Sequence, residues 1–215
     1  MTSDQLKEEQ MVVFDVKNVY DPFLRFIHAW NGICVFILMV SIWLKGFISH
    51  FSNGKEIIYR FHIYIGFALT IGITLRLIRG FIGPKNAKWK RFFFLQDWIK
   101  VLKTRKLDLS AHWGHDRYAS LVYLFFYFMM IYQIISGLMM AAKSYGMGPL
   151  TNLIEQSKEK IPLFHQLKEI HEIFFYISMI YVVVHVGMII LHENLNGHPI
   201  AQSMFNGKQY RKPKI

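Results

Sequence analysis

The 215-residue chain has only one cysteine, Cys34, and it lies inside an apolar run. A single cysteine excludes an intrachain disulfide, a thiolate-ligated iron–sulfur cluster and a covalent Cys-x-x-Cys-His haem attachment. Charge is also absent over long distances, because the stretches 26–44, 118–142 and 173–191 contain no Asp, Glu, Lys or Arg. Since 53% of all residues are hydrophobic, the composition argues against a soluble fold and places the chain among membrane proteins.

Four apolar runs have the length of membrane-spanning helices. A span needs roughly 20 apolar residues, and the three charge-free stretches meet that requirement. A fourth run, 61–75, continues until Arg76 and Arg79, whose long side chains can reach the headgroup region from a helix end. We therefore predict an all-α integral membrane fold, a four-transmembrane-helix bundle that forms a single domain over 1–215. The expected spans cover about 23–48, 58–82, 117–142 and 168–192.

Basic residues are concentrated on one side of the predicted bundle. The formal charge of +11 would suggest nucleic acid as the partner of a soluble protein, but ten Lys and Arg residues lie within 79–117, between the second and third spans. The positive-inside rule puts this loop in the cytoplasm, and four spans put both termini there too. Seventeen basic residues then lie inside and six outside. We expect a multi-pass protein of a bacterial inner membrane, with the lipid bilayer and no nucleic acid among its partners.

The connections between spans give further expectations. Within the predicted cytoplasmic loop 83–116, the segment 92–103 has the composition of an interfacial amphipathic helix. Pro162 stands where helices often begin, so the fourth helix is expected to start outside the membrane. The tail 193–215 is polar and basic, and we place it at the cytoplasmic surface.

Three of the ten histidines, His28, His62 and His185, lie within the predicted spans, and His171 lies at the outer edge of the fourth. Ionisable side chains inside a membrane are costly and by default mark functional sites. His171 and His185 are 14 residues apart. At about 100° per residue this spacing falls about 40° short of four full turns, so both rings share one helix face. At about 1.5 Å per residue they are separated by roughly 21 Å, one toward each side of the bilayer.

Helix direction decides which histidines share a depth. The first helix runs outward and the second inward, so His28 lies near the cytoplasm and His62 near the periplasm. The fourth helix also runs inward, which places His171 outside and His185 inside. Depth therefore pairs His62 with His171 and His28 with His185.

Two pairs of neutral imidazoles from different helices are what two six-coordinate haems need in a helix bundle. We therefore predict two non-covalent b haems, an outer one on His62 and His171 and an inner one on His28 and His185. Iron with two histidine ligands has no open position, so such haems pass electrons and do not activate oxygen.

Residues close to these histidines suit the same cofactor. Gly32 and Gly66 each follow a predicted ligand by four residues, which leaves space for a porphyrin one turn along the same face. Arg25 and Arg60 closely precede the ligands of the first two helices, and guanidinium groups pair well with carboxylates such as haem propionates.

The residues alone leave other interpretations of these histidines open. A lone histidine in a membrane helix often only bonds a neighbouring helix. His171 lies between Glu169 and Glu172, which is typical of an interface residue, and His192 competes with His185 because seven residues make two turns. His165 faces away from His185.

Several motifs together resemble a known family. They are Arg25-Phe-Ile-His28-Ala-Trp30, Phe61-His62, Trp113-Gly-His115 and the spacing from His171 to His185. This set resembles the cytochrome b subunit of membrane-bound nickel–iron hydrogenases, which is related to the gamma subunit of membrane formate dehydrogenases, over nearly the whole length. The resemblance implies four helices, two b haems and a 14-residue histidine pair on the last helix, which favours His185 over His192.

The resemblance also implies the partners. It implies a hydrogenase on the periplasmic face, with a small iron–sulfur and a large nickel–iron subunit, and a quinone site near the cytoplasmic haem. The chain would then be the electron-transfer and quinone-reducing subunit of a respiratory hydrogen:quinone oxidoreductase, with menaquinone or ubiquinone as substrate. The same scaffold serves formate dehydrogenase, thiosulfate reductase and free-standing cytochromes, which remain alternatives.

Candidate residues for the quinone site precede the third span. A quinone site needs an apolar slot and groups that bond carbonyls and deliver protons. His112, His115 and Asp116 lie at the inner mouth of that helix, on the side of the predicted inner haem. The alternative is that they are solvated loop residues. Members of the family often have His-Asn where this chain has His115-Asp116, so the family's contact at 116 does not carry over directly.

A transporter or assembly protein that binds metal ions through histidine is a rival of another class. Such a site gathers acidic or cysteine ligands with the histidines at one depth. Here the histidines divide between two depths, which favours the electron carrier.

Overall fold

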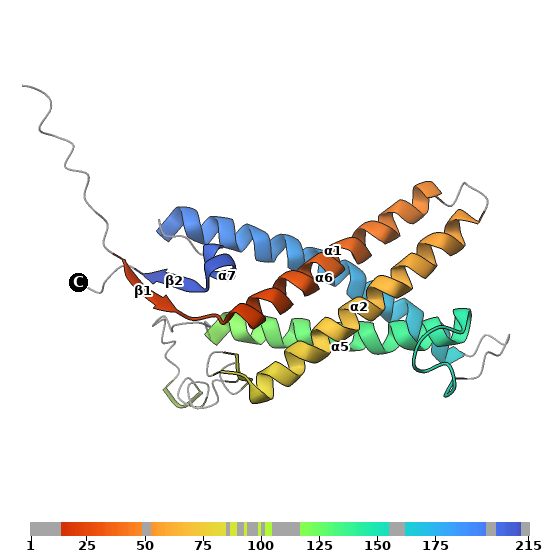
Figure 1. The fold of residues 1–215 in the computed structure, drawn as a ribbon, viewed down its shortest axis with the longest axis horizontal. Coiled ribbons are helices and arrows are strands. Elements are labelled where there is room, and N and C mark those ends of the chain that lie inside the picture. Colours follow the sequence, from red (N-terminus) through yellow and green to blue (C-terminus); the bar gives the residue numbers. More distant parts are fainter. Residues whose placement is uncertain are drawn as a thin grey trace, which may run out of the picture.

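Four long helices dominate the computed structural model, which describes residues 14–48, 53–84, 117–154, 162–196 and 201–211, with 87–89, 93, 99 and 102–104. They are α1 (Pro22–Ile48), α2 (Gly54–Ile82), α5 (Arg117–Tyr145) and α6 (Pro162–Asn196). Successive helices run in opposite directions along the length of the molecule, and α1 and α2 are inclined to α5 and α6 (Figure 1). We call the end with the starts of α1 and α5 the proximal end, and the opposite end the distal end.

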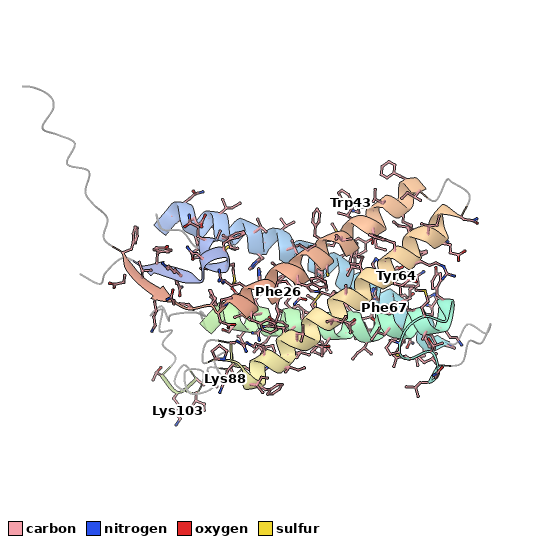
Figure 2. All side chains as sticks on the ribbon, in the orientation of Figure 1. Phe26, Trp43, Tyr64, Phe67, Lys88 and Lys103 are labelled. Atoms are coloured by element: carbon pink, nitrogen blue, oxygen red, sulfur yellow. The ribbon has the colours of Figure 1, made fainter. Side chains whose placement is uncertain are left out.

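All four helices are long and apolar enough to cross a membrane. Large apolar side chains cover their outer faces, and those of Phe26, Trp43 and Tyr64 are 57%, 71% and 60% exposed (Figure 2). In water such a surface would be unfavourable, whereas in a bilayer it faces lipid. The predicted four-helix membrane fold is therefore confirmed. Each predicted span falls almost entirely within a longer helix, and where the membrane begins on these helices stays a prediction.

Helix packing follows chain order. α1 packs on α2, α2 on α5 and α5 on α6. A small core of Cys34, Leu69, Ile73 and Met130 joins the first three of these helices. The indole Nε1 of Trp30 donates to the carbonyl of Ala68, 2.9 Å away, which ties α1 to α2. A side chain at Gly72 would collide with Trp30 and Asn31, so glycine there permits the close approach of these two helices.

Polar contacts join α1 and α2 at the proximal end. Asp21 precedes α1, and its Oδ1 accepts from the backbone N–H of Leu24 at 3.2 Å, which caps the helix. The same oxygen lies 2.8 Å from Nη2 of Arg79, near the end of α2. Arg76, buried on α2, donates from Nε to the hydroxyl of Tyr127 on α5 at 3.1 Å. The arginines that interrupt the second apolar run thus fasten the helices together at this end.

A two-stranded antiparallel sheet closes the proximal end. β1 (Asp15–Asn18) pairs with β2 (Lys208–Arg211), in a register that opposes Asp15 to Arg211. The short helix α7 (Gln202–Asn206) precedes β2, and Gly207 between them has φ of 81°, a conformation that favours glycine. The sequence interpretation did not include this sheet. The two paired strands lie beside the starts of α1 and α5 (Figure 1).

Two predictions concern the connections between the long helices. α6 begins at Pro162, as predicted for the fourth helix. Of the proposed interfacial helix 92–103, the structure describes Phe93, Ile99, Leu102 and Lys103, all in helical conformation. The rest of that segment lies outside the described residues.

Candidate functional site

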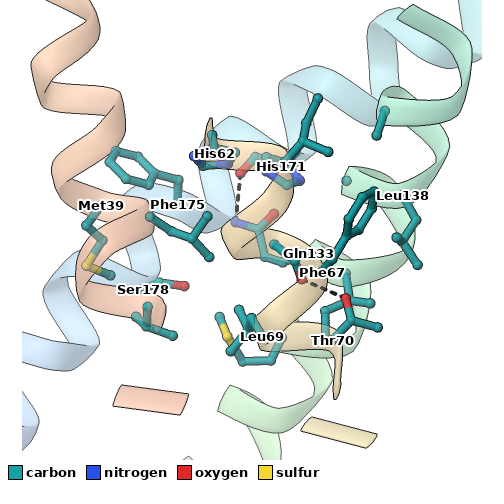
Figure 3. A pocket seen from close by; sticks show the side chains of 18 residues that line it. Met39, His62, Phe67, Leu69, Thr70, Gln133, Leu138, His171, Phe175 and Ser178 are labelled. Atoms are coloured by element: carbon teal, nitrogen blue, oxygen red, sulfur yellow. Dashed lines mark hydrogen bonds between the residues drawn. The ribbon is translucent and has the colours of Figure 1, made fainter. Parts of the chain in front are cut away.

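The distal half of the bundle holds an open cavity lined by all four helices. The space that it encloses, together with its part open to the surroundings, is about 710 Å³. His62 of α2 and His171 of α6 both line it, near one end of the space (Figure 3). Nearly all of the remaining lining is apolar. The structure therefore brings together the two histidines that the depth argument paired as outer ligands.

Each of these two imidazoles has a buried serine beside its Nδ1. Oγ of Ser41 on α1 lies 2.8 Å from Nδ1 of His62. Oγ of Ser136 on α5 lies 2.8 Å from Nδ1 of His171. With Nδ1 occupied in this way, the opposite ring nitrogen, Nε2, is the one available to a metal.

Small residues keep the cavity open beside the histidines. Gly66 lines it one turn after His62, and nothing lies within 4 Å of where its Cβ would be, in agreement with the space expected there. Gly137 on α5 also lines it, and a Cβ there would lie 3.5 Å from Cε1 of His171. Two lining polar atoms, Oε1 of Gln133 and Oγ of Ser178, are buried without a hydrogen-bond partner. The cavity is thus shaped by small and apolar residues with few polar groups.

A second histidine pair lies in the proximal half. The ring centroids of His28 on α1 and His185 on α6 are 6.5 Å apart, with ring planes at 49°. Imidazole nitrogens lie about 2 Å from a bound metal ion, so two rings that share one ion have centroids about 6 Å apart. His28 is exposed and His185 half-buried. Side chains therefore do not fill the space beside this pair.

An aromatic column supports the proximal pair from α5 and α6. The ring of Tyr181 stacks on that of His185 with centroids 5.8 Å apart and an interplanar angle of 8°. The ring of Phe126 on α5 stacks on that of Tyr181, with centroids 4.0 Å apart and an interplanar angle of 15°. Tyr181 precedes His185 by one helical turn, so the helix period itself produces the stack.

The competing histidines of α6 lie elsewhere. His165 is exposed, and its Nδ1 lies 3.3 Å from a carboxylate oxygen of Glu169, as expected for a surface residue. His192 is exposed near the end of the helix. His171 is half-buried and lies nine residues inside α6, although its flanking glutamates are typical of an interface. On α6, His171 and His185 each lie beside a histidine of another helix.

The two arginines proposed for propionates have protein partners. Nε of Arg60 lies 2.9 Å from Oε1 of Glu56, one turn earlier, and its guanidinium lies over the ring of Tyr145. Arg25 donates from Nη1 to the carbonyl of Phe205 in α7, while its Nε is buried without a partner. Their role toward propionates stays a prediction.

The quinone-site candidates His112, His115 and Asp116 lie outside the described residues, and their role also stays a prediction. The sequence interpretation missed Ser41, Ser136 and Gly137. A serine within an uninterrupted apolar run was the available signal, since both serines stand in charge-free stretches.

The site fits b-type haem on its own chemistry. It offers neutral imidazoles in pairs, open space beside them and an apolar lining, as a non-covalent haem requires. Within the ranges that the structure describes, no group of three or more His, Cys, Asp or Glu side chains is placed to hold a bare metal ion.

Comparison with known proteins agrees with this assignment. A family model described as prokaryotic cytochrome b561 matches residues 19–207, a segment that contains all four helices and all four paired histidines. No curated protein and no solved structure matches the chain. Because the match covers most of the sequence, the chain belongs to the prokaryotic cytochrome b561 family, and it is a multi-pass membrane cytochrome b that binds b-type haem and transfers electrons.

Proposed function

We propose that the chain is the di-haem subunit of a membrane hydrogen:quinone oxidoreductase. His62 and His171 would hold one haem in the distal half, and His28 and His185 the other in the proximal half. The observation that carries this proposal is the presence of two imidazole pairs in opposite halves of the bundle, each drawn from two helices, at the two depths that electron transfer across a bilayer requires.

The residues around each pair suit an electron carrier. When bound between two histidines, haem b supplies reversible one-electron chemistry without an open position for oxygen. The distal cavity surrounds its two imidazoles with an almost entirely apolar lining. The stack of Phe126, Tyr181 and His185 limits rotation of the proximal imidazole. The chain thus holds its ligands rigidly, which keeps the reorganisation that accompanies each electron small.

The charge distribution supports a direction of electron flow, from the periplasm toward the cytoplasm. With the basic proximal end in the cytoplasm, the distal cavity faces the periplasm. A periplasmic hydrogenase oxidises H₂ to two protons and two electrons, and the chain passes these electrons inward to a quinone, which takes two protons from the cytoplasm to become a quinol. Moving each electron against a negative interior costs about 2.3 kcal/mol per 100 mV. Turnover therefore builds membrane potential in respiration.

The quinone would bind near the proximal end. His112, His115 and Asp116 directly precede α5, which starts there, and they carry groups that bond carbonyls and exchange protons. We propose them as the site at which menaquinone or ubiquinone is reduced.

The identity of the donor rests on the resemblance to hydrogenase cytochromes. The equivalent subunit of a formate dehydrogenase, a thiosulfate reductase or another membrane oxidoreductase is the alternative, because the electron-carrying core would be the same. The small iron–sulfur subunit of the donor would dock on the distal face.

The test has two parts, carried out on the chain purified from its native membranes in mild detergent. A pyridine haemochrome assay should find close to two acid-extractable haems per chain, and a count of one would overturn the two-pair proposal. Hydrogenase subunits should co-purify, and H₂ should reduce both haems. Co-purification of a formate or thiosulfate enzyme instead would replace the donor and keep the haem assignment.

A further inference from the structure

We propose that Ser41 and Ser136 are positioning residues that fix the tautomers of His62 and His171 and lower the reduction potential of the haem held between them. This inference rests on the proposed function, because it takes His62 and His171 as axial ligands. It adds two residues that neither the motifs nor the family match single out.

The hydrogen-bond arrangement at Ser41 determines which ring nitrogen of His62 carries the proton. Oγ of Ser41 lies 2.7 Å from the carbonyl oxygen of Leu38, one turn earlier on α1, and 2.8 Å from Nδ1 of His62. A serine hydroxyl has one hydrogen, and a carbonyl can only accept. The hydroxyl therefore donates to Leu38 and accepts from Nδ1–H of His62. The proton on Nδ1 leaves the lone pair on Nε2, the nitrogen that then binds iron.

Ser136 repeats this arrangement in the other helical hairpin. Its Oγ lies 2.7 Å from the carbonyl of Tyr132 and 2.8 Å from Nδ1 of His171. Ser41 and Ser136 are each only 1% exposed, so water does not compete for these bonds. In both cases the serine belongs to the helix that precedes the histidine helix. α1 thus orients a ligand on α2, and α5 orients a ligand on α6.

The proximal pair of histidines differs from the distal pair in its hydrogen bonds. Among the described residues, no hydrogen bond is present to a ring nitrogen of His28 or His185, and their contacts are with aromatic rings. Within the part of the chain that the structure describes, a serine hydroxyl bonded to the imidazole Nδ1 is therefore found at the distal pair and not at the proximal pair.

A hydrogen bond at Nδ1 fixes the orientation of the imidazole and also changes the basicity of its Nε2. Donation from Nδ1–H to an oxygen makes Nε2 more basic, and a more basic ligand stabilises ferric over ferrous iron. Both axial ligands of the distal site have this bond. The two serines therefore lower the potential at the side where electrons are proposed to enter, which makes their onward passage to the proximal side more favourable.

The experiment uses the full-length chain in detergent and compares Ser41→Ala and Ser136→Ala with Ser178→Ala. Ser178 lines the same cavity and is 2% exposed, but its Oγ bonds to neither imidazole, so it controls for the loss of a buried hydroxyl. Redox titration should show an upward shift of one of the two haem potentials in Ser41→Ala and in Ser136→Ala. The shift in Ser178→Ala should be smaller. The ferric EPR signal of the same haem should change in the first two variants.

Two further variants keep the test decisive if an alanine variant folds poorly. Ser41→Thr and Ser136→Thr retain a hydroxyl that can bond the carbonyl one turn back, so they should restore the wild-type potential and EPR signal. Wild-type values in both alanine variants, or an equal shift in Ser178→Ala, would overturn the inference. Loss of a haem in His62→Ala together with unchanged values in Ser41→Ala would refute only the role of the serines. Retention of both haems in His62→Ala would refute the ligand assignment itself.

Discussion

Each paired histidine has a chemical environment that distinguishes it from His165 on α6. His62 and His171 have a hydroxyl at Nδ1 and open space beside the ring. His28 and His185 lie together, with His185 stacked on Tyr181. His165 is exposed and lies beside the carboxylate of Glu169 one turn along the helix, an arrangement typical of a helix surface.

Alanine substitution of the four histidines should therefore remove haems in pairs. His62→Ala and His171→Ala should each abolish the same haem, and His28→Ala and His185→Ala the other, because one ligand does not hold iron in a low-spin site. Haem content by pyridine haemochrome and the spectrum of the remaining haem measure this. His165→Ala, on the same helix as two of the ligands, serves as the control and should keep both haems.

Two outcomes would contradict the way the four histidines are assigned to the two haems. If His62→Ala and His185→Ala removed the same haem, the depth argument would be wrong. If His192→Ala removed a haem while His185→Ala kept both, the assignment on α6 would be wrong.

Space beside the distal histidines is the second property set by single residues. Gly66→Leu should lower the content of the distal haem severalfold, because the new side chain would occupy part of the cavity that Gly66 lines. Gly46→Leu is a matched control, since Gly46 is exposed near the end of α1, away from the cavity, with nothing within 4 Å of its Cβ position. Equal haem loss in both variants would show that leucine harms the helices rather than the cavity.

At the scale of helices, polar residues at the proximal end decide how α1 and α2 meet. Asp21 both caps α1 and pairs with Arg79 of α2 through one carboxylate oxygen. The guanidinium of Arg79 also lies over the ring of Phe23, 5.3 Å from its centroid. One residue in front of a helix thus fixes where that helix starts and how its neighbour ends.

Removal of this carboxylate should destabilise the bundle in a graded way. Asp21→Ala should cost about 1 kcal/mol for the lost cap, and up to about 1 kcal/mol more for the partly exposed ion pair. Asp21→Asn keeps an oxygen acceptor for the N–H of Leu24, so it should lose only the ion-pair part. Thermal unfolding in detergent, followed by loss of the haem spectrum, should rank the wild type, Asp21→Asn and Asp21→Ala in falling order. Equal Tm values for the two variants would mean that the cap contributes nothing measurable.

At the scale of the whole molecule, the paired strands and the basic residues Lys88 and Lys103 lie at the same end of the bundle (Figure 2). Four antiparallel helices bring β1, β2 and the start of α5 to one end of the bundle (Figure 1). The positive-inside rule assigns this end to the cytoplasm.

Cysteine labelling tests this orientation in intact cells. Lys103→Cys should resist a membrane-impermeant maleimide, and Asn152→Cys, in the connection between α5 and α6, should react, since both native residues are exposed and belong to opposite sides in the proposed topology. The native Cys34 is buried, so its background labelling should be low. Labelling of Lys103→Cys alone would invert the topology and with it the proposed direction of electron flow.

Variants of the proposed quinone residues should slow quinone reduction without loss of haem. In His115→Ala and Asp116→Ala, both haems should remain and should still be reduced by the donor, because neither residue is a proposed ligand. Reoxidation by a soluble menaquinone analogue should slow about 10-fold or more if proton delivery is lost. Stopped-flow absorbance measures this rate. Wild-type reoxidation in both variants would move the quinone site away from the start of α5.

Much of this protein is determined by its sequence alone. The four apolar runs predicted four membrane-spanning helices, because a bilayer admits few structures other than apolar helices. Helix period and direction predicted the two histidine pairs, since a 14-residue spacing on α6 leaves both rings on one face at different depths. The members of each pair lie near one another in the structure, and their role as haem ligands stays a prediction. Pro162 marked the start of the fourth long helix.

Other features were decided only by the tertiary structure. Ser41 and Ser136 lie 21 and 35 residues before the histidines they contact, and no helical period relates a residue on one helix to a residue on the next. The pairing of β1 with β2 joins two four-residue segments near opposite ends of the chain, too short to show a strand pattern. Local periodicity arises from the backbone and is visible in the sequence. Contacts between helices depend on how the helices rotate and tilt against one another, and packing alone decides that.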